Sequence, residues 1–181
     1  MSGNLVRICL VLDQDNLNRN TIRPTHVGYS MPAGFQRLRK RLEQIGPIVF
    51  PVIFGPRRSI SLELGILQAE GFWPIPCLGK RENVDRLGHG EDTVDARIIA
   101  FIQEVLPQMT ETTHLCLGSG DHHFAPAIED LKRRRPELKV MLVVGSFDSL
   151  SPDLQKLADR DPKTGKKMIY IFSPTVEEPA Q

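Results

Sequence analysis

Short, nearly continuous apolar runs alternate along the chain with stretches in which apolar residues recur every three or four positions. Runs of the first kind are typical of strands buried on both faces, and the second spacing predicts amphipathic helices. Pro51 interrupts the second run, which indicates a bulge or a sheet edge there. The strands expected on this basis are residues 6–12, 48–54, 72–78, 114–118, 140–144 and 168–172.

The helical stretches lie between these runs, and several carry start or stop signals. Ser59 is expected to cap a helix that carries Ile60, Leu64 and Leu67 on one stripe and ends before Gly71. The other helices are expected around residues 35–45, from Asp92 to about Leu106, around residues 124–131, and from the Ser151–Pro152 pair onwards. This alternation predicts an α/β fold with three layers, α/β/α, around a mostly parallel sheet of five to six strands.

The length of 181 residues suits one domain, which we expect to span residues 1–175, with residues 176–181 as a frayed tail. The net charge is +1 at pH 7, so no overall field draws the protein to nucleic acid or to a membrane surface. Any contact with a polyanion must therefore come from a local basic patch. No apolar stretch approaches the roughly 20 residues that a membrane span needs.

The cysteines indicate a reducing compartment. Cys9, Cys77 and Cys116 are odd in number, lie far apart, and all fall in strand-like runs. Buried free thiols are therefore expected rather than disulfides. The short apolar run at the N-terminus also lacks the flanks of a signal peptide. We expect a cytoplasmic protein.

Three carboxylates are candidates for a metal site. Asp13 and Asp121 follow the first and fourth expected strands directly, where open α/β sheets bind their ligands. Asp95 shares a helical stripe with Ile98 and Ile102, which turns it toward the sheet. Each also has a structural explanation, as a turn residue, a helix cap or a first-turn acid. Three convergent carboxylates would suit a hard cation such as Mg²⁺ or Mn²⁺.

Basic side chains follow the second and third expected strands and so face the same edge. These residues are Arg57, Arg58, Lys80 and Arg81. They are either a local surface for an anionic partner or solvated charges without a partner. The basic run 132–135 ends a helix at the opposite edge, where it complements the helix dipole.

Four stretches, in this order, make the chain resemble the NYN domain family, in the LabA-like branch of the PIN-like nucleases. LVLDQDNL resembles the opening strand of the family, in which an aspartate, here Asp13, is followed three residues on by an asparagine, here Asn16. TVDARIIAFIQEVL resembles the helix opened by a Val-Asp pair, here with Asp95.

The other two stretches cover the later strands and the closing helix. LGSGDHHFAPAIEDLKRR resembles the Ser-Gly-Asp-x-Asp-Phe segment of the family, with Ser119 and Asp121 matched, and SPDLQKLAD resembles the closing helix. Two positions depart from the pattern. His123 stands where the family has a second aspartate, and Asp92 stands where a lysine is often found.

The resemblance implies a sheet in the order 3-2-1-4-5, a Mg²⁺ or Mn²⁺ site, and hydrolysis of phosphodiester bonds in RNA. Asp13, Asp95 and Asp121 would hold the metal, with His123 as a further candidate ligand. Asn16 and Ser119 would orient ligands or the attacking water. The basic residues at the same edge would then track the RNA backbone.

Two other functions compete with this one. The departures from the family pattern leave room for a domain that binds RNA or a protein partner without cutting. The first strand also matches a haloacid-dehalogenase-type phosphatase, with Asp13 as nucleophile and Asp15 as acid. That scheme leaves Asp95 without a role, so we rank it lower. The sequence leaves the oligomeric state open, a homodimer included.

Overall fold

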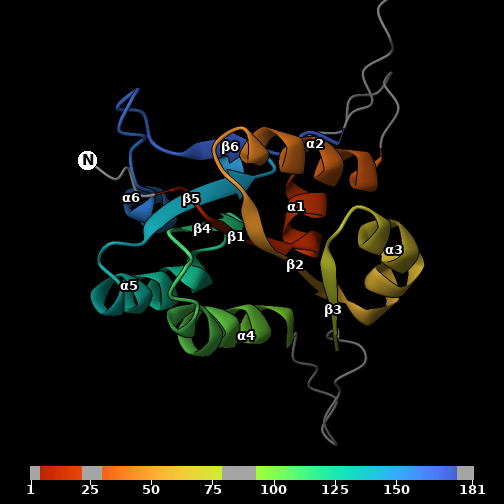
Figure 1. Cartoon of the computed structure of the whole chain (residues 1–181). Helices are drawn as coiled ribbons and strands as arrows, with labels where there is room; N and C mark the ends of the chain where they lie inside the picture. The colour runs from red at the N-terminus through yellow and green to blue at the C-terminus, as the bar shows by residue number, and fades with distance from the viewer. Residues whose placement is uncertain (1–4, 22–29, 79–92, 175–181) are drawn as a thin grey trace, which may run out of the picture.

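The computed structural model describes residues 5–21, 30–78 and 93–174, and its centre is a sheet in the order β3-β2-β1-β4-β5-β6 (Figure 1). All neighbouring strands in the sheet run parallel. The expected parallel sheet and its order 3-2-1-4-5 are confirmed, and β6 extends it by one strand. The strands are β1 (Ile8–Asp13), β2 (Ile48–Pro56), β3 (Trp73–Cys77), β4 (His114–Gly118), β5 (Lys139–Val144) and β6 (Ile169–Ile171).

Helices cover both faces of the sheet, which gives the expected three layers (Figure 1). One layer contains α1 (Gln14–Asn20), α2 (Met31–Glu43) and α3 (Arg57–Ala69). The other contains α4 (Thr93–Ala100), α5 (Ala125–Arg134) and α6 (Pro152–Leu157). Shorter helical segments are η1 (Phe101–Val105), η2 (Leu106–Gln108), η3 (His122–Phe124) and η4 (Phe147–Ser149).

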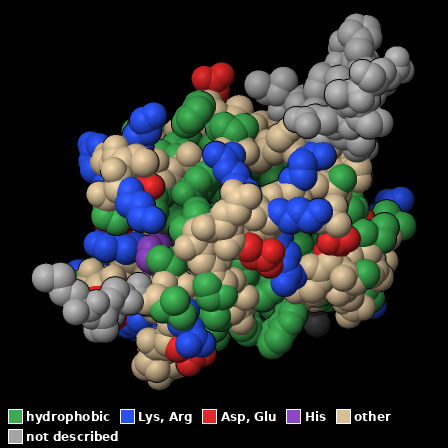
Figure 2. Space-filling model, turned by 45° about the horizontal axis from the view of Figure 1, so that its top comes forward, with side chains coloured by type: hydrophobic (Ala, Val, Ile, Leu, Met, Phe, Trp, Pro, Cys, Tyr) green, Lys and Arg blue, Asp and Glu red, His purple; other side chains and the backbone are tan. Residues whose placement is uncertain are grey.

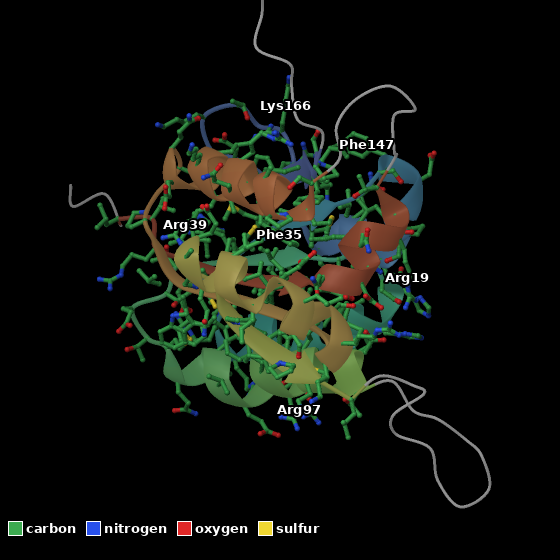
Figure 3. The ribbon with its side chains drawn as sticks, turned by 90° about the vertical axis from the view of Figure 1, so that its right-hand side faces the viewer. Arg19, Phe35, Arg39, Arg97, Phe147 and Lys166 are labelled. Carbon is green, nitrogen blue, oxygen red and sulfur yellow. The ribbon has the colours of Figure 1, made fainter. Side chains whose placement is uncertain are left out.

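The continuous apolar runs supply two separate cores because successive side chains of a strand point to opposite faces. In β1, Leu10 and Leu12 pack toward α1–α3, whereas Cys9 and Val11 pack toward α4–α6. Phe35 of α2 is fully buried in the first core, with its ring centroid 5.8 Å from that of Phe72 (Figure 3). No helix in the described ranges is long and apolar enough to cross a membrane.

Near Pro51 the sequence indicated a bulge or a sheet edge, and the structure has both. The register between β1 and β2 shifts between Ile8 and Cys9, so that one residue of β2, Val49, is skipped. On the other side, β3 begins to pair only at Val52. Pro51 therefore lies on a stretch of β2 that pairs with β1 alone, and such an edge is where sheets tolerate proline.

The start of α3 differs from the expectation. Ser59 is not its cap: the helix begins at Arg57, directly after β2, with Pro56 at the N-cap and no side-chain cap. The strand passes into the helix without a loop, and Ser59 lies inside the first turn. Ile60 and Leu67 are buried as expected, but Leu64 is 40% exposed because it lies at the margin of the buried face.

The long helix expected to end near Leu106 is α-helical only in its first part. It is α-helical to Ala100, then a π-turn and a 3₁₀-turn carry it to Gln108. Pro107 has no N–H to give to the carbonyl of Gln103. Arg134 of α5 donates to that carbonyl instead, at 2.6 Å. The basic end of α5 therefore satisfies backbone carbonyls as well as complementing its own dipole.

The three cysteines are buried free thiols, as expected. Cys9 and Cys116 lie on neighbouring strands, but they pack in different cores on opposite faces of the sheet. Burial raises the pKa of the Cys9 thiol to about 12, and burial with the neighbouring Cys9 raises the pKa of Cys116. These two thiols are therefore protonated and unreactive at neutral pH.

Candidate functional site

The candidate site lies at the carboxyl ends of β1 and β4. These strands are neighbours, with Leu12 opposite Gly118, so that Asp13 and Ser119 follow at adjacent strand ends. The strand order reverses at this pair: β2 and β3 lie on the β1 side of the sheet, and β5 and β6 lie on the β4 side. Such a reversal of strand order opens a crevice at the carboxyl ends of the strands.

Asp13 is the last residue of β1 and only 4% exposed. Its carboxylate accepts a hydrogen bond from the Asn16 N–H at 3.0 Å and caps α1. This helix was not expected from the sequence, because its seven residues are polar except for Leu17 and show no apolar period. The cap at Asp13, an alternative explanation of that residue, is therefore present.

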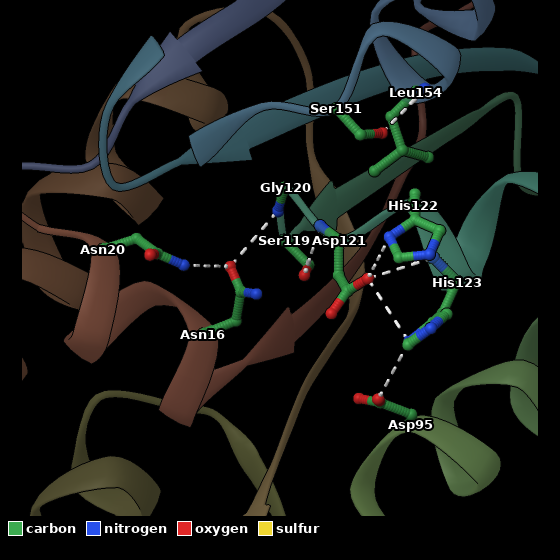
Figure 4. A network of polar contacts seen from close by, with 10 residues as sticks. All are labelled: Asn16, Asn20, Asp95, Ser119, Gly120, Asp121, His122, His123, Ser151 and Leu154. Atoms are coloured by element: carbon green, nitrogen blue, oxygen red, sulfur yellow. Dashed lines mark hydrogen bonds and ion pairs between the residues drawn. The ribbon is translucent and has the colours of Figure 1, made fainter. Parts of the chain in front are cut away.

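Asn16 links α1 to the loop after β4. Its Oδ1 accepts hydrogen bonds from the Gly120 N–H at 3.2 Å and from Asn20 Nδ2 at 3.1 Å (Figure 4). The Gly120 carbonyl in turn accepts from the Ser151 N–H at 3.0 Å. A Cβ at Gly120 would collide with the Ser149 carbonyl oxygen. Only glycine fits between these two segments, so the Ser-Gly-Asp loop is held on both sides.

The same loop positions the carboxylate of Asp121. Ser119 is fully buried, and its hydroxyl oxygen accepts a hydrogen bond from the Asp121 N–H at 3.3 Å. Asp121 Oδ1 then accepts from the His123 N–H at 3.1 Å and caps η3. The side chain of Asp121 is 30% exposed, so it is oriented by the loop yet open to solvent.

Two histidines gather around Asp121. Its Oδ1 lies 3.2 Å from His122 Nδ1 and 3.4 Å from His123 Nδ1. His123 Nδ1 also lies 3.8 Å from Asp95 Oδ2, so that one imidazole stands between two carboxylates of different elements (Figure 4). One ligand atom from each of Asp121, His122 and His123 falls within 4.8 Å of the others. One oxygen and two nitrogen donors at this spacing could hold a divalent cation.

Asp95 reaches this cluster from the first turn of α4. Val94, Ile98 and Ile102 are buried in the core, which fixes the rotation of the helix. The Asp95 side chain is 38% exposed and lies at the margin of the buried face. The structure thus brings Asp95 and Asp121 together through His123, with Asp13 at the neighbouring strand end.

The basic residues surround the same edge. Arg57 and Arg58 are exposed in the first turn of α3, immediately after β2. Both charges stand at the positive end of the helix dipole, where they oppose helix stability. A purely structural role does not explain that placement. Lys80 and Arg81, the other two candidates, lie outside the described residues.

Three residues near this edge were not predicted from the sequence. Arg19 of α1 pairs with Asp15 at 2.7 Å, and Arg97 of α4 is exposed two residues after Asp95 (Figure 3). Gln14 is 4% exposed and donates to Glu63 Oε2 at 2.7 Å, which ties α1 to α3. All three lie on helices, whereas the rule for parallel sheets points to strand ends. Basic residues within two to four positions of a candidate acid were the available signal for the two arginines.

Comparisons with known proteins agree with this fold. A model of the NYN domain matches residues 7–161, a range that contains every candidate site residue named above. The fold also matches the crystal structure of a protein of unknown function from Vibrio parahaemolyticus, with a TM-score of 0.60 over 94% of each chain and 16% identity. That likeness concerns the fold alone. No protein with a curated description matches the chain.

Proposed function

The chain belongs to the NYN domain family, a PIN-like nuclease type of domain, and from this premise we propose that it is a metal-dependent ribonuclease that hydrolyses phosphodiester bonds in RNA. The observation that carries the proposal is the convergence of Asp95 and Asp121 on His123 beside the end of β1, where Asp13 lies. Acids from two separate elements approach one imidazole at the switch point of the sheet, where this architecture binds ligands, and a third acid ends the neighbouring strand.

The donor set fits Mg²⁺ or Mn²⁺. Asp13, Asp95 and Asp121 offer hard carboxylate oxygens, and His123 adds a nitrogen that Mn²⁺ tolerates better than Mg²⁺ does. A bound divalent ion supplies an acidified water and neutralises charge on the phosphate. The protein's own contribution is to hold these acids in place. Asp13 is fixed by its hydrogen bond to Asn16, and Asp121 by the loop that begins at Ser119.

We assign Asn16 and Ser119 to positioning. The Asn16 amide oxygen keeps α1 against the backbone of Gly120, and the buried Ser119 hydroxyl keeps the Asp121 backbone in place. Both act on the orientation of a carboxylate. Removal of either side chain should therefore weaken metal affinity more than it changes the chemistry that follows.

The RNA backbone would lie along the basic edge. Arg57 and Arg58 are exposed next to the carboxyl end of β2, which borders β1 in the sheet. In the described part of the chain neither arginine has a side-chain hydrogen bond or salt bridge, so both are available for phosphates. We include Lys80 and Arg81 in this surface from their place in the sequence.

Cleavage of a fluorescently labelled single-stranded RNA tests the proposal, with Mg²⁺, with Mn²⁺ and with a chelator. Cleavage should need a metal and should be abolished in Asp95→Asn and Asp121→Asn. The reduction should exceed the roughly 10–100-fold seen when groups behind metal ligands are removed. Asp153→Asn is the matched control, because Asp153 is 63% exposed and its carboxylate pairs with Lys156 on α6. Equal activity in all three variants and with chelator would refute the proposal.

A second candidate function is an RNA- or protein-binding module that does not cut. The placement of His123 favours it, because an imidazole between Asp95 and Asp121 removes the carboxylate that the family pattern has there. RNA binding that survives the chelator, without cleavage under either metal, would identify this function. The phosphatase scheme is less well supported, since its acid, Asp15, pairs with Arg19 on the surface of α1.

We propose that the protein resides in the cytoplasm, because its cysteines are free thiols rather than disulfides. Cys9, Cys77 and Cys116 are buried and reduced, so they need no oxidising compartment.

A further inference from the structure

A cleft lies at the amino ends of the strands, at the opposite edge of the sheet from the acidic cluster. Its volume is about 740 Å³, within the range of small-molecule sites. The walls come from the turns before β2, β4 and β5 and from the segment between α6 and β6. Figure 2 shows this face, with Lys and Arg side chains gathered near a histidine and beside a strip of apolar side chains.

The cleft carries an excess of positive charge. Arg135, Lys139, Arg160 and Lys163 line it, against two acids, Glu137 and Asp161. Because the whole chain has a net charge of only +1, this concentration of cations is local. An anion would be favoured here over a cation or a neutral molecule.

Two of these cations are available to a ligand. Arg135 and Arg160 are committed to backbone carbonyls, since Arg135 donates to those of Met109 and Thr112 and Arg160 to that of Gly165. Lys139 is half exposed and its ammonium lies 3.8 Å from Asp159 Oδ1, a loose pairing. The Lys163 ammonium has no hydrogen bond or salt bridge to the residues that the structure describes. Lys139 and Lys163 could therefore turn toward a phosphate.

The interior of the cleft offers polar and apolar surface together. Thr112 is fully buried, and its hydroxyl has no hydrogen-bond partner within the described ranges. Burial lowers the pKa of His114, against the opposing effect of Asp159, so the ring stays neutral at pH 7. Met168 and Tyr170 add apolar surface on the side of β6. A buried polar atom without a partner is costly, and a ligand with hydroxyl groups could relieve that cost.

We propose that this cleft is a binding site for a nucleoside monophosphate. Lys139 and Lys163 receive the phosphate, and Thr112 belongs to the wall that meets the ribose. The base would lie against the His114 ring and the face of the Tyr170 ring turned away from Arg41, whose guanidinium lies 4.9 Å from the centre of that ring. Inorganic phosphate would leave most of the volume empty. A purely apolar ligand would leave the ammonium groups unused. This site is separate from the acidic cluster and does not depend on the proposed ribonuclease activity.

Titration of the full chain with AMP tests the proposal, by calorimetry and by amide chemical shifts, with a chelator present so that no metal at the other edge can hold phosphate. Adenosine and inorganic phosphate are titrated separately. AMP should bind one to one and at least about tenfold more tightly than either part, because charge and stacking act together. The amides that shift should be those of residues 112–114 and 139.

Three variants locate the site. Lys163→Glu should weaken AMP binding by about tenfold or more, since an attraction becomes a repulsion. Thr110→Trp should weaken it by filling the mouth, because Thr110 is exposed and lines the cleft. Lys40 is an exposed residue of α2, so Lys40→Glu makes the same charge change away from the cleft wall and should leave the affinity for AMP unchanged. Equal affinity for AMP and inorganic phosphate, or equal reductions in Lys163→Glu and Lys40→Glu, would overturn the proposal.

Discussion

At the scale of single residues, Asp13 has two roles that a pair of substitutions can separate. Its carboxylate caps α1 and, in the proposed site, binds metal. Asn also caps helices, so Asp13→Asn should lose Mn²⁺ affinity with little change in stability. Asp13→Ala should abolish metal binding and also remove about 1 kcal/mol from the free energy of unfolding. Calorimetry with Mn²⁺ and urea unfolding measure the two effects. Unaltered Mn²⁺ affinity in Asp13→Asn would contradict the metal role.

His123 is the residue at which this chain departs from its family within the site itself. Its Nδ1 stands 3.4 Å from Asp121 and 3.8 Å from Asp95. Restoring a carboxylate by His123→Asp should favour hard cations, so that Mg²⁺-supported cleavage of single-stranded RNA appears or rises relative to Mn²⁺. His122→Asp is the comparison at the neighbouring imidazole, whose Nδ1 lies 3.2 Å from Asp121 and whose ring lies 4.1 Å from that of His123 (Figure 4). An unchanged metal preference in His123→Asp would remove His123 from the site.

The residues of the site were predictable to different degrees. Asp13 and Asp121 follow apolar strands, and strand ends are visible in an apolar pattern. The contact between Asp95 and His123 was not, because it depends on the rotation of α4 set by three buried residues. The family resemblance named Asn16 as an orienting residue, but its hydrogen bond to Gly120 was not predictable. It requires that α1 exist, and nothing periodic in that segment indicates a helix.

At the scale of elements, the start of α3 offers a test of RNA binding. Alanine at both Arg57 and Arg58 should flatten the dependence of RNA affinity on salt, by up to ~0.7 in slope for each phosphate that the protein no longer neutralises. The same change should raise stability slightly, because two positive charges leave the positive end of a helix. Fluorescence anisotropy across a salt series and thermal unfolding measure these effects.

The control for this test is Arg133→Ala. Arg133 is 77% exposed at the far end of α5 and pairs with Asp130. Its neighbours are unsuitable, since Arg134 and Arg135 donate to backbone carbonyls. An equal change of slope in the control and in the double variant would mean that RNA lies on a different face.

Asp159 joins α5 to β5 and gives the fold a dependence on pH. Its Oδ2 accepts from Lys132 Nζ at 2.7 Å and from the Val140 N–H at 2.8 Å. Burial alone would raise the pKa of Asp159, but these hydrogen bonds and the charges of Lys132 and Lys139 lower it on balance. A lowered pKa in the folded state means that the stabilisation is present above the unfolded value and is lost as the pH falls through the folded value.

Asp159→Asn should therefore lower the free energy of unfolding at pH 7 by about 1–2 kcal/mol. The difference from the unaltered protein should vanish well below pH ~3.9, the usual value of an unfolded aspartate, where both chains are neutral at this position. Asp153→Asn, on the surface, should cost at most about 0.5 kcal/mol. Urea unfolding over a pH series measures both. A difference that persists at low pH would point to packing rather than charge.

The elements themselves were largely predictable, and the exceptions have physical causes. Each apolar run forms a strand, because strands buried on both faces need continuous apolar sequence. Ser59 misled because serine often caps helices, whereas here the strand turns directly into α3 at Arg57. The π-turn after Ala100 was not predicted, and the arginine that donates to the Gln103 carbonyl within it comes from another helix, α5.

At the scale of the whole molecule, the three layers followed from strand–helix alternation, and the position of the acidic cluster followed from the rule for parallel sheets. The cleft at the amino ends of the strands could not be predicted in this way. Its walls come from turns spread between Val6 and Tyr170, and none of these turns has a distinctive sequence. Only the assembled sheet brings Lys139 and Lys163 to the same cavity.

The parallel pairing of β1 with β4 also sets an order in time. The hydrogen bond from Gly120 to Asn16 joins residues 104 positions apart, and β4 can take its place beside β1 only after both have left the ribosome. At about 5–20 residues per second, synthesis of that interval takes on the order of 5–20 s. Throughout that time the growing chain carries Asp13 without the loop that follows β4. The proposed ribonuclease would therefore stay inactive while most of its chain is still being made on the messenger that encodes it.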